Sequence, residues 1–454
     1  MNPLARVLVE RYRCPESFLQ FAVQHSRTGG PGFFRLGSNV ICYGDSAAGD
    51  RNSRPEGNLY DAVADIRIEE SEVFLPFDPA KIIDNLRLER YPGTQDCWVR
   101  SNARKIYYHL RPFLNRTTRE RIQKFQLKNW RERQFPAWPV DASVEDIHEQ
   151  LLLLALRAGK TDTIPFVWFW PDGYSACMIM THDVEGEAGK NFCSELMDID
   201  DSYGMKASFQ LVPENSYSLS QEFLSLIRNR GFEVGLQDLN HDGRLYNSRP
   251  EFLRRAKLIN QYAGEYGAKG FRAGVLYRNP EWFDAFEFSF DMSIPNVAHL
   301  DPQHGGCCTV IPYFIGNILE MPVTTSQDYT LFHLLGERSI DLWKNQIDLI
   351  LKKSGLMSFI VHPDYVINDG VSDLYRKLLG YLRDLRESTN LWFTLPVQLD
   401  AWWRQRSKMR LVPNGKDWRI EGEGAERAVI AYAKKVDGNL VYELEPALTH
   451  SSRQ

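Results

Sequence analysis

The stretch "SACMIMTHDVEGEAGKNFCSELMDIDDSYGMKASFQLVP", residues 175–213, decides the fold class, because two short apolar runs in it enclose one helical segment. The runs "SACMIMTHD" and "KASFQLVP" predict strands, and the stretch "AGKNFCSELMDIDDSYG" between them predicts a helix. A strand, a helix and a second strand in this order are typical of parallel strands joined by a crossover helix.

The same alternation continues along the chain. Further strand-like runs are "FEVGLQD", "KGFRAG", "FSFDMS", "NILEMPVT", "LMSFIVHPD" and "LWFTLP", with helical stretches between most of them. Seven or eight strands over roughly 230 residues match the size of a (β/α) barrel. The sequence therefore predicts an α/β fold whose centre, residues 141–404, is a distorted (β/α) barrel of seven or eight parallel strands.

Both flanks of this barrel differ from it in texture. Residues 1–140 mix strand-like and helix-like pieces with many turn formers and predict an α+β region, in which the charged run at 114–133 predicts a helix. Residues 405–454 alternate apolar and polar side chains around an Asp-Gly turn signal at 437–438 and predict a small β module. Because this segment is too short to form an independent core, we expect it to dock on the barrel.

Composition excludes several classes of protein. The chain has 454 residues, 43% of them hydrophobic and 25% charged, with a formal net charge of −5. A chain without a basic excess is not expected to bind nucleic acid. No apolar run is long enough for a transmembrane segment or a signal peptide. Seven cysteines without a CxxC pair favour a reduced, cytoplasmic protein.

Polar residues follow several of the predicted strands. In a parallel barrel the carboxyl ends of the strands and the loops after them form the active site. The strand assignments therefore predict that one rim gathers Asp183, Glu185, Gln237, His241, Arg272 and His362.

Asp183 and Glu185 lie two residues apart at the end of the first of these strands. In an extended chain side chains at this spacing share one face. One carboxylate could then hold a metal while the other takes a proton from a metal-bound water. The alternative is that both acids only cap the following helix, whose N-terminus favours negative charge.

Gln237 lies four residues before His241. Two histidines at this spacing would be half of a metal site, but here one partner is an amide. His241 could be a metal ligand or a turn histidine bonded to backbone.

Arg272 and His362 each follow a strand-like run. Arg272 could form a surface ion pair, or it could lie beside Asp183 and keep that carboxylate ionised. His362 could be a core residue, or it could donate a proton to a leaving group with Asp364 orienting its ring.

Taken together, these motifs resemble the polysaccharide deacetylase family, the NodB-homology hydrolases of carbohydrate esterase family 4. The resemblance rests on "THDVE" at 181–185, "QDLNH" at 237–241, "FRAG" at 271–274 and "FIVH" at 359–362, and it covers about 175–400. It implies a distorted (β/α) barrel, in agreement with the strand pattern, and a bacterial source.

The resemblance also implies roles for single residues. Asp183 matches the catalytic base, and Arg272 matches the arginine that braces the base. His362 matches the catalytic acid. Glu185 matches the acidic metal ligand, and His241 matches the second histidine of the metal motif.

Two positions depart from the family pattern. Gly274 stands where a proline is usual, which we expect only to loosen a loop, and Gln237 replaces the first metal-ligand histidine. An amide oxygen is a poor zinc donor and suits a harder ion better. Gln237 could ligate weakly or hold a metal-bound water, or the site could be an empty sugar-binding site. Asp238 and His182 could also substitute, although neighbours in a strand point to opposite faces.

The sequence thus predicts a metal-dependent hydrolase that removes an N-acyl group from a sugar or carbohydrate intermediate. The acyl group that we expect first is acetyl. The metal would be zinc, or nickel, cobalt or manganese, held by Glu185, His241 and Gln237. A cytoplasmic location favours a small sugar, a nucleotide sugar or a lipid-linked intermediate as substrate. The alternative is a catalytically impaired barrel that acts as a carbohydrate-binding or assembly protein.

Overall fold

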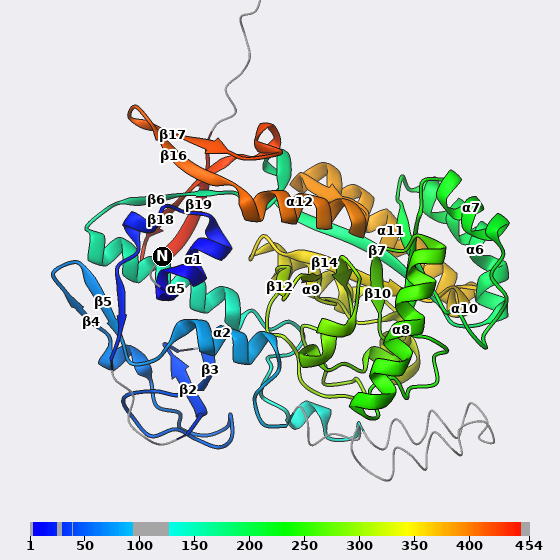
Figure 1. Cartoon of the computed structure of the whole chain (residues 1–454), viewed down its shortest axis with the longest axis horizontal. Helices are drawn as coiled ribbons and strands as arrows, with labels where there is room; N and C mark the ends of the chain where they lie inside the picture. The colour runs from blue at the N-terminus through cyan, green and yellow to red at the C-terminus, as the bar shows by residue number, and fades with distance from the viewer. Residues whose placement is uncertain (1–2, 25–29, 39, 94–126, 446–454) are drawn as a thin grey trace, which may run out of the picture. The chain divides into compact units, whose positions relative to one another are not determined.

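The structure is a computed structural model (Figure 1), and the residues it describes are 3–24, 30–38, 40–93 and 127–445. The chain divides into two compact units. Unit 1 comprises Met1–Leu86, Ser143–Tyr174 and Ala401–Gln454. Unit 2 comprises Arg87–Ala142 and Ser175–Asp400. Most of the helix predicted over 114–133 lies outside the described residues, and Trp130–Glu132 near its end is a short 3-10 turn.

Unit 2 is built around a nine-stranded sheet in the order β12-β13-β11-β10-β9-β8-β7-β14, with β15 also paired to β7. The strands are β7 (Ala176–Val184), β8 (Ala207–Leu211), β9 (Glu233–Gln237), β10 (Gly270–Arg272), β11 (Phe290–Asp291), β12 (Tyr313–Ile315), β13 (Ile318–Glu320), β14 (Leu356–Val361) and β15 (Leu391–Phe393). All pairings are parallel except that of β12 with β13. The parallel α/β character predicted from the sequence is therefore confirmed.

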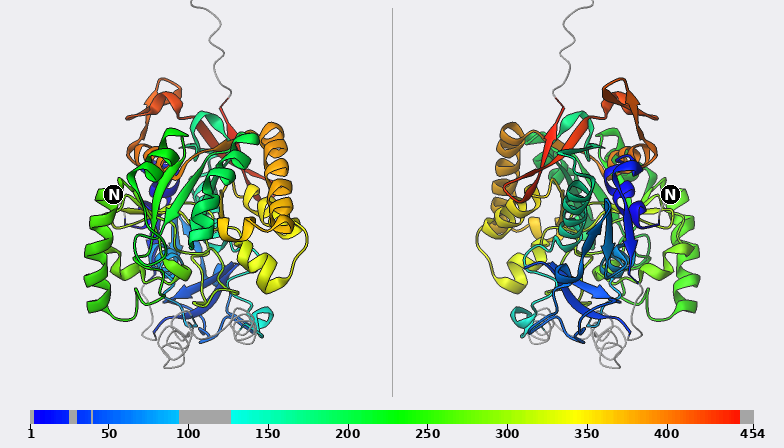
Figure 2. Two further views of the ribbon diagram at one scale, coloured as in Figure 1. Left: turned by 90° about the vertical axis from the view of Figure 1, so that its right-hand side faces the viewer. Right: turned by 90° about the vertical axis from the view of Figure 1, so that its left-hand side faces the viewer.

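Crossover helices connect these strands, as Figure 2 shows from two sides. They are α6 (Glu187–Ser202), α7 (Gln221–Asn229), α8 (Arg249–Tyr266), α9 (Asp341–Leu351), α10 (Pro363–Val366) and α11 (Asp369–Thr389). Local sequence sets their ends. The hydroxyl of Ser248 accepts from the N–H of Glu251 at the start of α8, and Gly267 ends the helix at φ 60°.

The core of unit 2 explains why β7 reads as one apolar run. All nine residues of β7 are buried, because helices cover one face of the sheet and side chains of the other strands cover the opposite face. Met178 and Met180 pack in the same cluster as Leu196 of α6 and Leu378 of α11. This packing fixes the end of β7.

The sheet does not close through backbone pairing. Among the described residues the ladder ends at β14 on one side and at β12 on the other. Two hydroxyls bridge the gap that follows β13: Thr324 Oγ1 donates to the carbonyl of Leu356 (2.7 Å), and Thr325 Oγ1 donates to that of Ser358 (2.8 Å). The sheet is thus curled and mostly parallel, and the predicted closed barrel of seven or eight strands is not confirmed.

Unit 1 combines the two ends of the chain. Its sheets are β1-β5-β4, β2-β3, β19-β18-β6 and β16-β17. Its strands are β1 (Phe21–Val23), β2 (Gly32–Leu36), β3 (Val40–Gly44), β4 (Arg67–Glu69), β5 (Glu72–Leu75), β6 (Thr163–Val167), β16 (Arg410–Asn414), β17 (Asp417–Glu421), β18 (Ile430–Val436) and β19 (Asn439–Leu444). Its helices are α1 (Pro3–Tyr12), α2 (Pro79–Arg87), which ends one residue past the unit boundary, α5 (Ser143–Gly159) and α12 (Pro396–Lys408), which begins just before the unit's last segment.

The strand β6 places residues 143–174 differently from the sequence-based division, which assigned them to the barrel. β6 pairs antiparallel with β18, so the C-terminal strands share a sheet with this segment. The Asp437-Gly438 turn joins β18 to β19 with positive φ at both residues, as the sequence indicates.

Two further observations concern the described residues of both units. The six cysteines among them are all buried. Among the helices that the structure describes, none combines the length and the apolar character needed to cross a bilayer.

Candidate active site

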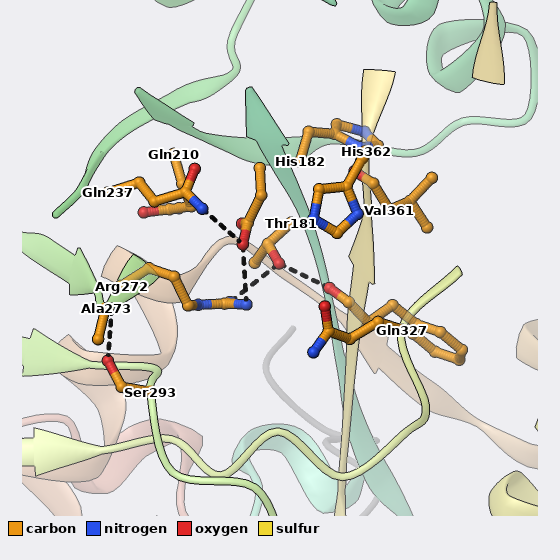
Figure 3. Close-up of polar contacts among 12 residues, drawn as sticks. Thr181, His182, Gln210, Gln237, Arg272, Ala273, Ser293, Gln327, Val361 and His362 are labelled. Carbon is orange, nitrogen blue, oxygen red and sulfur yellow. Dashed lines mark hydrogen bonds and ion pairs between the residues drawn. The ribbon is translucent and has the colours of Figure 1, made fainter. Parts of the chain in front are cut away.

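The six predicted residues lie at the carboxyl ends of the strands of unit 2 or in the loops that follow them. Figure 3 shows three of them, Gln237, Arg272 and His362. Three of them are within strands, near or at the last position: Asp183 on β7, Gln237 on β9 and Arg272 on β10. Glu185 and His362 directly follow β7 and β14, and His241 lies in the loop between β9 and α8. Parallel strands bring their carboxyl ends to one edge, which is why residues so far apart in the sequence meet here.

Arg272 lies beside Asp183. Its guanidinium is fully buried, with Nη1 3.6 Å from Asp183 Oδ2 and Nη2 donating to Thr181 Oγ1 (3.0 Å). Thr181 in turn donates to the carbonyl of Phe359 on β14 (2.6 Å). Asp183 Oδ1 is buried without a hydrogen-bond partner. One carboxylate oxygen therefore faces the arginine and the other is left for a further group.

Glu185 lies between two imidazoles. Its Oε1 is 3.0 Å from His241 Nε2 and 3.6 Å from His362 Nε2. Burial raises the pKa of Glu185, but the two histidines outweigh that effect and hold it well below its usual range. With 27% of its side chain exposed, against 4% for Asp183, Glu185 is the more accessible of the two acids.

His362 forms a tight pair with Asp328. Its Nδ1 is 2.6 Å from Asp328 Oδ1, and its backbone N–H donates to Oδ2 of the same carboxylate (2.8 Å). Burial lowers the pKa of His362, but Asp328 and Glu185 outweigh it and raise the pKa well above its ordinary value. The ring is therefore protonated around neutral pH and can give a proton.

The sequence assigned the orientation of His362 to Asp364, and this prediction is wrong. Asp364 instead accepts from the N–H groups of Glu185 and Gly189 (both 3.1 Å) at the start of α6, where a helix N-terminus attracts an acid. The residue that does contact the ring of His362 is Asp328. Because it lies in a loop eight residues after β13, no strand end pointed to it.

Gln237 contacts Asp183 rather than a histidine. Its Nε2 donates to Asp183 Oδ2 (3.4 Å), while its buried Oε1 has no hydrogen-bond partner. His241, four residues later, follows a turn and has φ 52°. The amide and the imidazole are thus both part of the candidate site, but Gln237 is placed against the predicted base.

Gly274 has a steric role that the sequence did not indicate. A Cβ at this position would lie 2.6 Å from Asp238 Oδ2 and 3.0 Å from His241 Cδ2. Any larger residue, proline included, would push these groups away. The expectation that this glycine only loosens a loop is therefore too weak, since its missing side chain makes room for His241.

His182 does not substitute for the missing histidine. It points to the face of β7 opposite to Asp183, where its Nε2 lies 2.9 Å from Asp200 Oδ2. Asp238 uses Oδ1 to accept from the N–H of Leu239 (2.7 Å). The sequence analysis expected neighbouring side chains of the strand to point to opposite faces. This expectation is confirmed for His182.

The side chains of the candidate site include groups that could bind a metal ion. In the part of the chain that the structure describes, no three His, Cys, Asp or Glu side chains meet in an arrangement that would hold a metal ion. Glu185 and His241 are two strong donors in contact, and Gln237 Oε1 and Asp183 Oδ1 are buried oxygens without a partner. These four atoms suit a divalent cation in kind, with an oxygen in place of the third strong ligand.

Comparisons with known proteins find no family model and no curated sequence that matches. Solved structures do match. A candidate polysaccharide deacetylase from Mycobacterium smegmatis has a TM-score of 0.43 at 16% identity, over 55% of this chain and 98% of its own. Puue allantoinase has a TM-score of 0.41 at 12% identity, over 52% of this chain and 92% of its own. The peptidoglycan deacetylase PdaC from Bacillus subtilis has a TM-score of 0.32 at 14% identity, over 52% of this chain and 95% of its own.

The resemblance to polysaccharide deacetylases that the motifs indicated is thus found again among solved structures. These similarities cover about half of the chain at low identity, with TM-scores below 0.5. What the side chains of unit 2 can do therefore has to follow from their own geometry.

Proposed function

We propose that unit 2 is a hydrolase that removes an N-acyl group, with acetyl the first to test, from a sugar or carbohydrate intermediate. One observation carries this proposal: a carboxylate beside a buried arginine, a second carboxylate between two imidazoles, and an imidazole charged by Asp328 share one sheet edge. Together they supply a base, an acid and an anionic ligand.

Asp183 would act as the general base. Arg272 lies beside its Oδ2, while its Oδ1 has no hydrogen-bond partner and can accept a proton from the attacking water. His362 would act as the general acid, because Asp328 keeps its ring protonated. In the reaction a water oxygen bonds to the acyl carbon, the C–N bond breaks, Asp183 receives the water proton and His362 gives its proton to the departing amine.

Glu185 and His241, with Gln237 as a weak third donor, would hold a divalent metal. Such a metal, zinc or else nickel, cobalt or manganese, would polarise the acyl oxygen and acidify bound water. In a bacterial cytoplasm, which the sequence indicates, a nucleotide sugar or a lipid-linked sugar is a more suitable substrate than a finished polymer.

A second function has support of its own. Gln237 bonds to Asp183, and Glu185 pairs directly with both histidines, so several groups that would act on a metal or a water are already held by protein partners. The same edge could then bind carbohydrate without catalysis, as a binding or assembly protein.

One experiment separates the two functions. We expect purified full-length protein to bind one divalent metal per chain and to release acetate from an N-acetylated nucleotide sugar or an N-acetylglucosamine oligomer. Metal content is measured by mass spectrometry of the protein and acetate by an enzymatic assay. Absence of stoichiometric metal, together with no acetate after addition of zinc, nickel, cobalt or manganese, would leave only the binding function.

Replacing Gln237 with histidine should strengthen metal binding. The variant Gln237→His adds an imidazole to Glu185 and His241, and we expect at least a tenfold gain in affinity, since even indirect support of a ligand is worth about 10–100-fold. Calorimetry with zinc and cobalt absorption spectra measure the change. Gln346→His, at a buried glutamine bonded to Ser326 and Pro139, is the control and should leave affinity unchanged. Equal affinities of Gln237→His and wild type would mean that the other ligands lie elsewhere.

A further inference from the structure

Behind the candidate site, on the opposite face of β7, three buried polar side chains form a chain of hydrogen bonds. His182 Nδ1 is 3.1 Å from the carbonyl oxygen of Val361, and its Nε2 is 2.9 Å from Asp200 Oδ2. The hydroxyl of Tyr375 donates to Asp200 Oδ1 (2.6 Å). His182, Asp200 and Tyr375 are each at most 1% exposed, so water does not compete for these bonds.

The partners come from four different elements. His182 is on β7, Val361 ends β14, Asp200 is on α6 and Tyr375 is on α11. His182 immediately precedes Asp183, and Val361 immediately precedes His362, so the imidazole joins the two strands one residue before the base and the acid. Figure 3 shows His182 and Val361 beside His362.

The two ring nitrogens of His182 both face oxygen atoms. Both ring nitrogens face oxygen acceptors, a backbone carbonyl and a carboxylate, so both contacts are satisfied when each nitrogen carries a hydrogen. Burial and Asp200 raise the pKa of Tyr375 well above its ordinary value, so its hydroxyl remains the donor. Asp200 thus contacts the ring of His182 with one carboxylate oxygen and accepts from Tyr375 with the other. Such pairs are directional and strong in a dry environment.

The inner face of β7 carries a matching bond. Thr181, one residue earlier, donates to the carbonyl of Phe359 on β14 and accepts from Arg272. Two consecutive side chains of β7 thus bond to carbonyls of β14 from opposite faces. The relative position of the two strand ends is fixed on both sides.

We propose that His182, Asp200 and Tyr375 are a positioning triad, which holds the ends of β7 and β14 so that Asp183 and His362 keep the separation that acyl transfer to water needs. This inference rests on the proposed function. None of the three touches the reacting atoms. They act through backbone, and small displacements of reacting groups are known to cost on the order of 100-fold in rate.

The test uses full-length protein labelled with ¹⁵N-histidine. In the wild type we expect both ring nitrogens of His182 to show the signals of hydrogen-bonded nitrogens. Tyr375→Phe removes only one hydroxyl, and we expect it to lower kcat for acetate release about tenfold with KM unchanged, and to shift the ring signals of His362. Tyr313→Phe is the matched control, because that buried hydroxyl donates to the carbonyl of Arg87. It should alter neither quantity.

The outcomes separate this inference from the proposed function. If the wild type releases no acyl group from any sugar, the proposed function fails, while the triad is still judged by the ring signals of His182 and His362. A His182 ring whose nitrogens show no hydrogen bond overturns the triad. So does a Tyr375→Phe variant whose His362 signals match those of Tyr313→Phe. His182→Gln, which keeps one donor, should fall between wild type and a complete loss of kcat if it folds.

Discussion

Asp183→Asn should lower kcat for acyl release by about 10³-fold or more without unfolding the protein. Asparagine keeps the shape and the acceptor oxygen but cannot take a proton, and a general base contributes about 10²–10⁴-fold. It also removes the negative partner of the buried Arg272. The first effect acts on the chemical step and the second on the ground state of the site, so kcat should change much more than KM.

The fold should survive this substitution because Arg272 has other acidic neighbours. Burial raises the pKa of both Asp291 and Glu320, which lie together, while Arg272 acts in the opposite direction on each of them. One negative charge in this pair can compensate the guanidinium when Asp183 is neutral. A buried cation with no partner at all would cost several kcal/mol.

Asp301→Asn is the matched control for Asp183→Asn. Asp301 is also in unit 2, and burial raises its pKa to about 6, so a neutral side chain is tolerated there. We expect its acyl release to stay within a few-fold of wild type. Initial rates over a range of substrate concentrations and urea unfolding measure both variants. If Asp183→Asn keeps more than a tenth of the wild-type kcat, another group is the base.

Much of this site could be predicted because strand ends carry a strong local signal. Asp183 is the second-last residue of the buried strand β7, which is followed by Glu185, and β14 is followed by His362. Parallel topology then brings these ends together, whatever lies between them in the sequence. Because neighbouring residues of a strand point to opposite faces, the sequence also predicts that His182 and Asp183 lie on opposite faces of β7.

The features of the site and the fold that the sequence did not predict also have physical explanations. Asp328 belongs to a loop, and a loop residue is placed by tertiary packing that no periodicity reports. Asp364 is close to His362 in sequence but finds better partners in the free N–H groups of α6. The pairing of β6 with β18 joins segments more than 250 residues apart, and the sequence marks each strand but not its partner.

Glu89→Gln should cost unit 2 about 3–5 kcal/mol of unfolding free energy, since it breaks a buried ion pair on one side. Arg278 is completely buried, and its Nε donates to Glu89 Oε2 (2.7 Å) while Nη2 bonds Oε1 (2.5 Å). Glu89 Oε1 also accepts from the N–H of Gly306 (2.6 Å), and Arg278 Nη1 donates to the carbonyl of Leu276 (2.9 Å). The pair therefore joins three separate segments.

The charge, more than the number of hydrogen bonds, should set this cost. Burial lowers the pKa of Arg278, but Glu89 outweighs it and raises the pKa above its ordinary value. Without Glu89 the guanidinium still stays charged, because the ordinary pKa of arginine lies far above neutral pH. The double variant Glu89→Gln/Arg278→Met removes both charges and should recover most of the loss. Glu251→Gln removes a partly exposed carboxylate that pairs with exposed Arg254 and with buried Arg255. Arg255 keeps its pair with Asp242, so the cost should be at most about 1 kcal/mol. Urea unfolding compares the four proteins, and a cost for Glu89→Gln no larger than for Glu251→Gln would mean that water reaches Arg278.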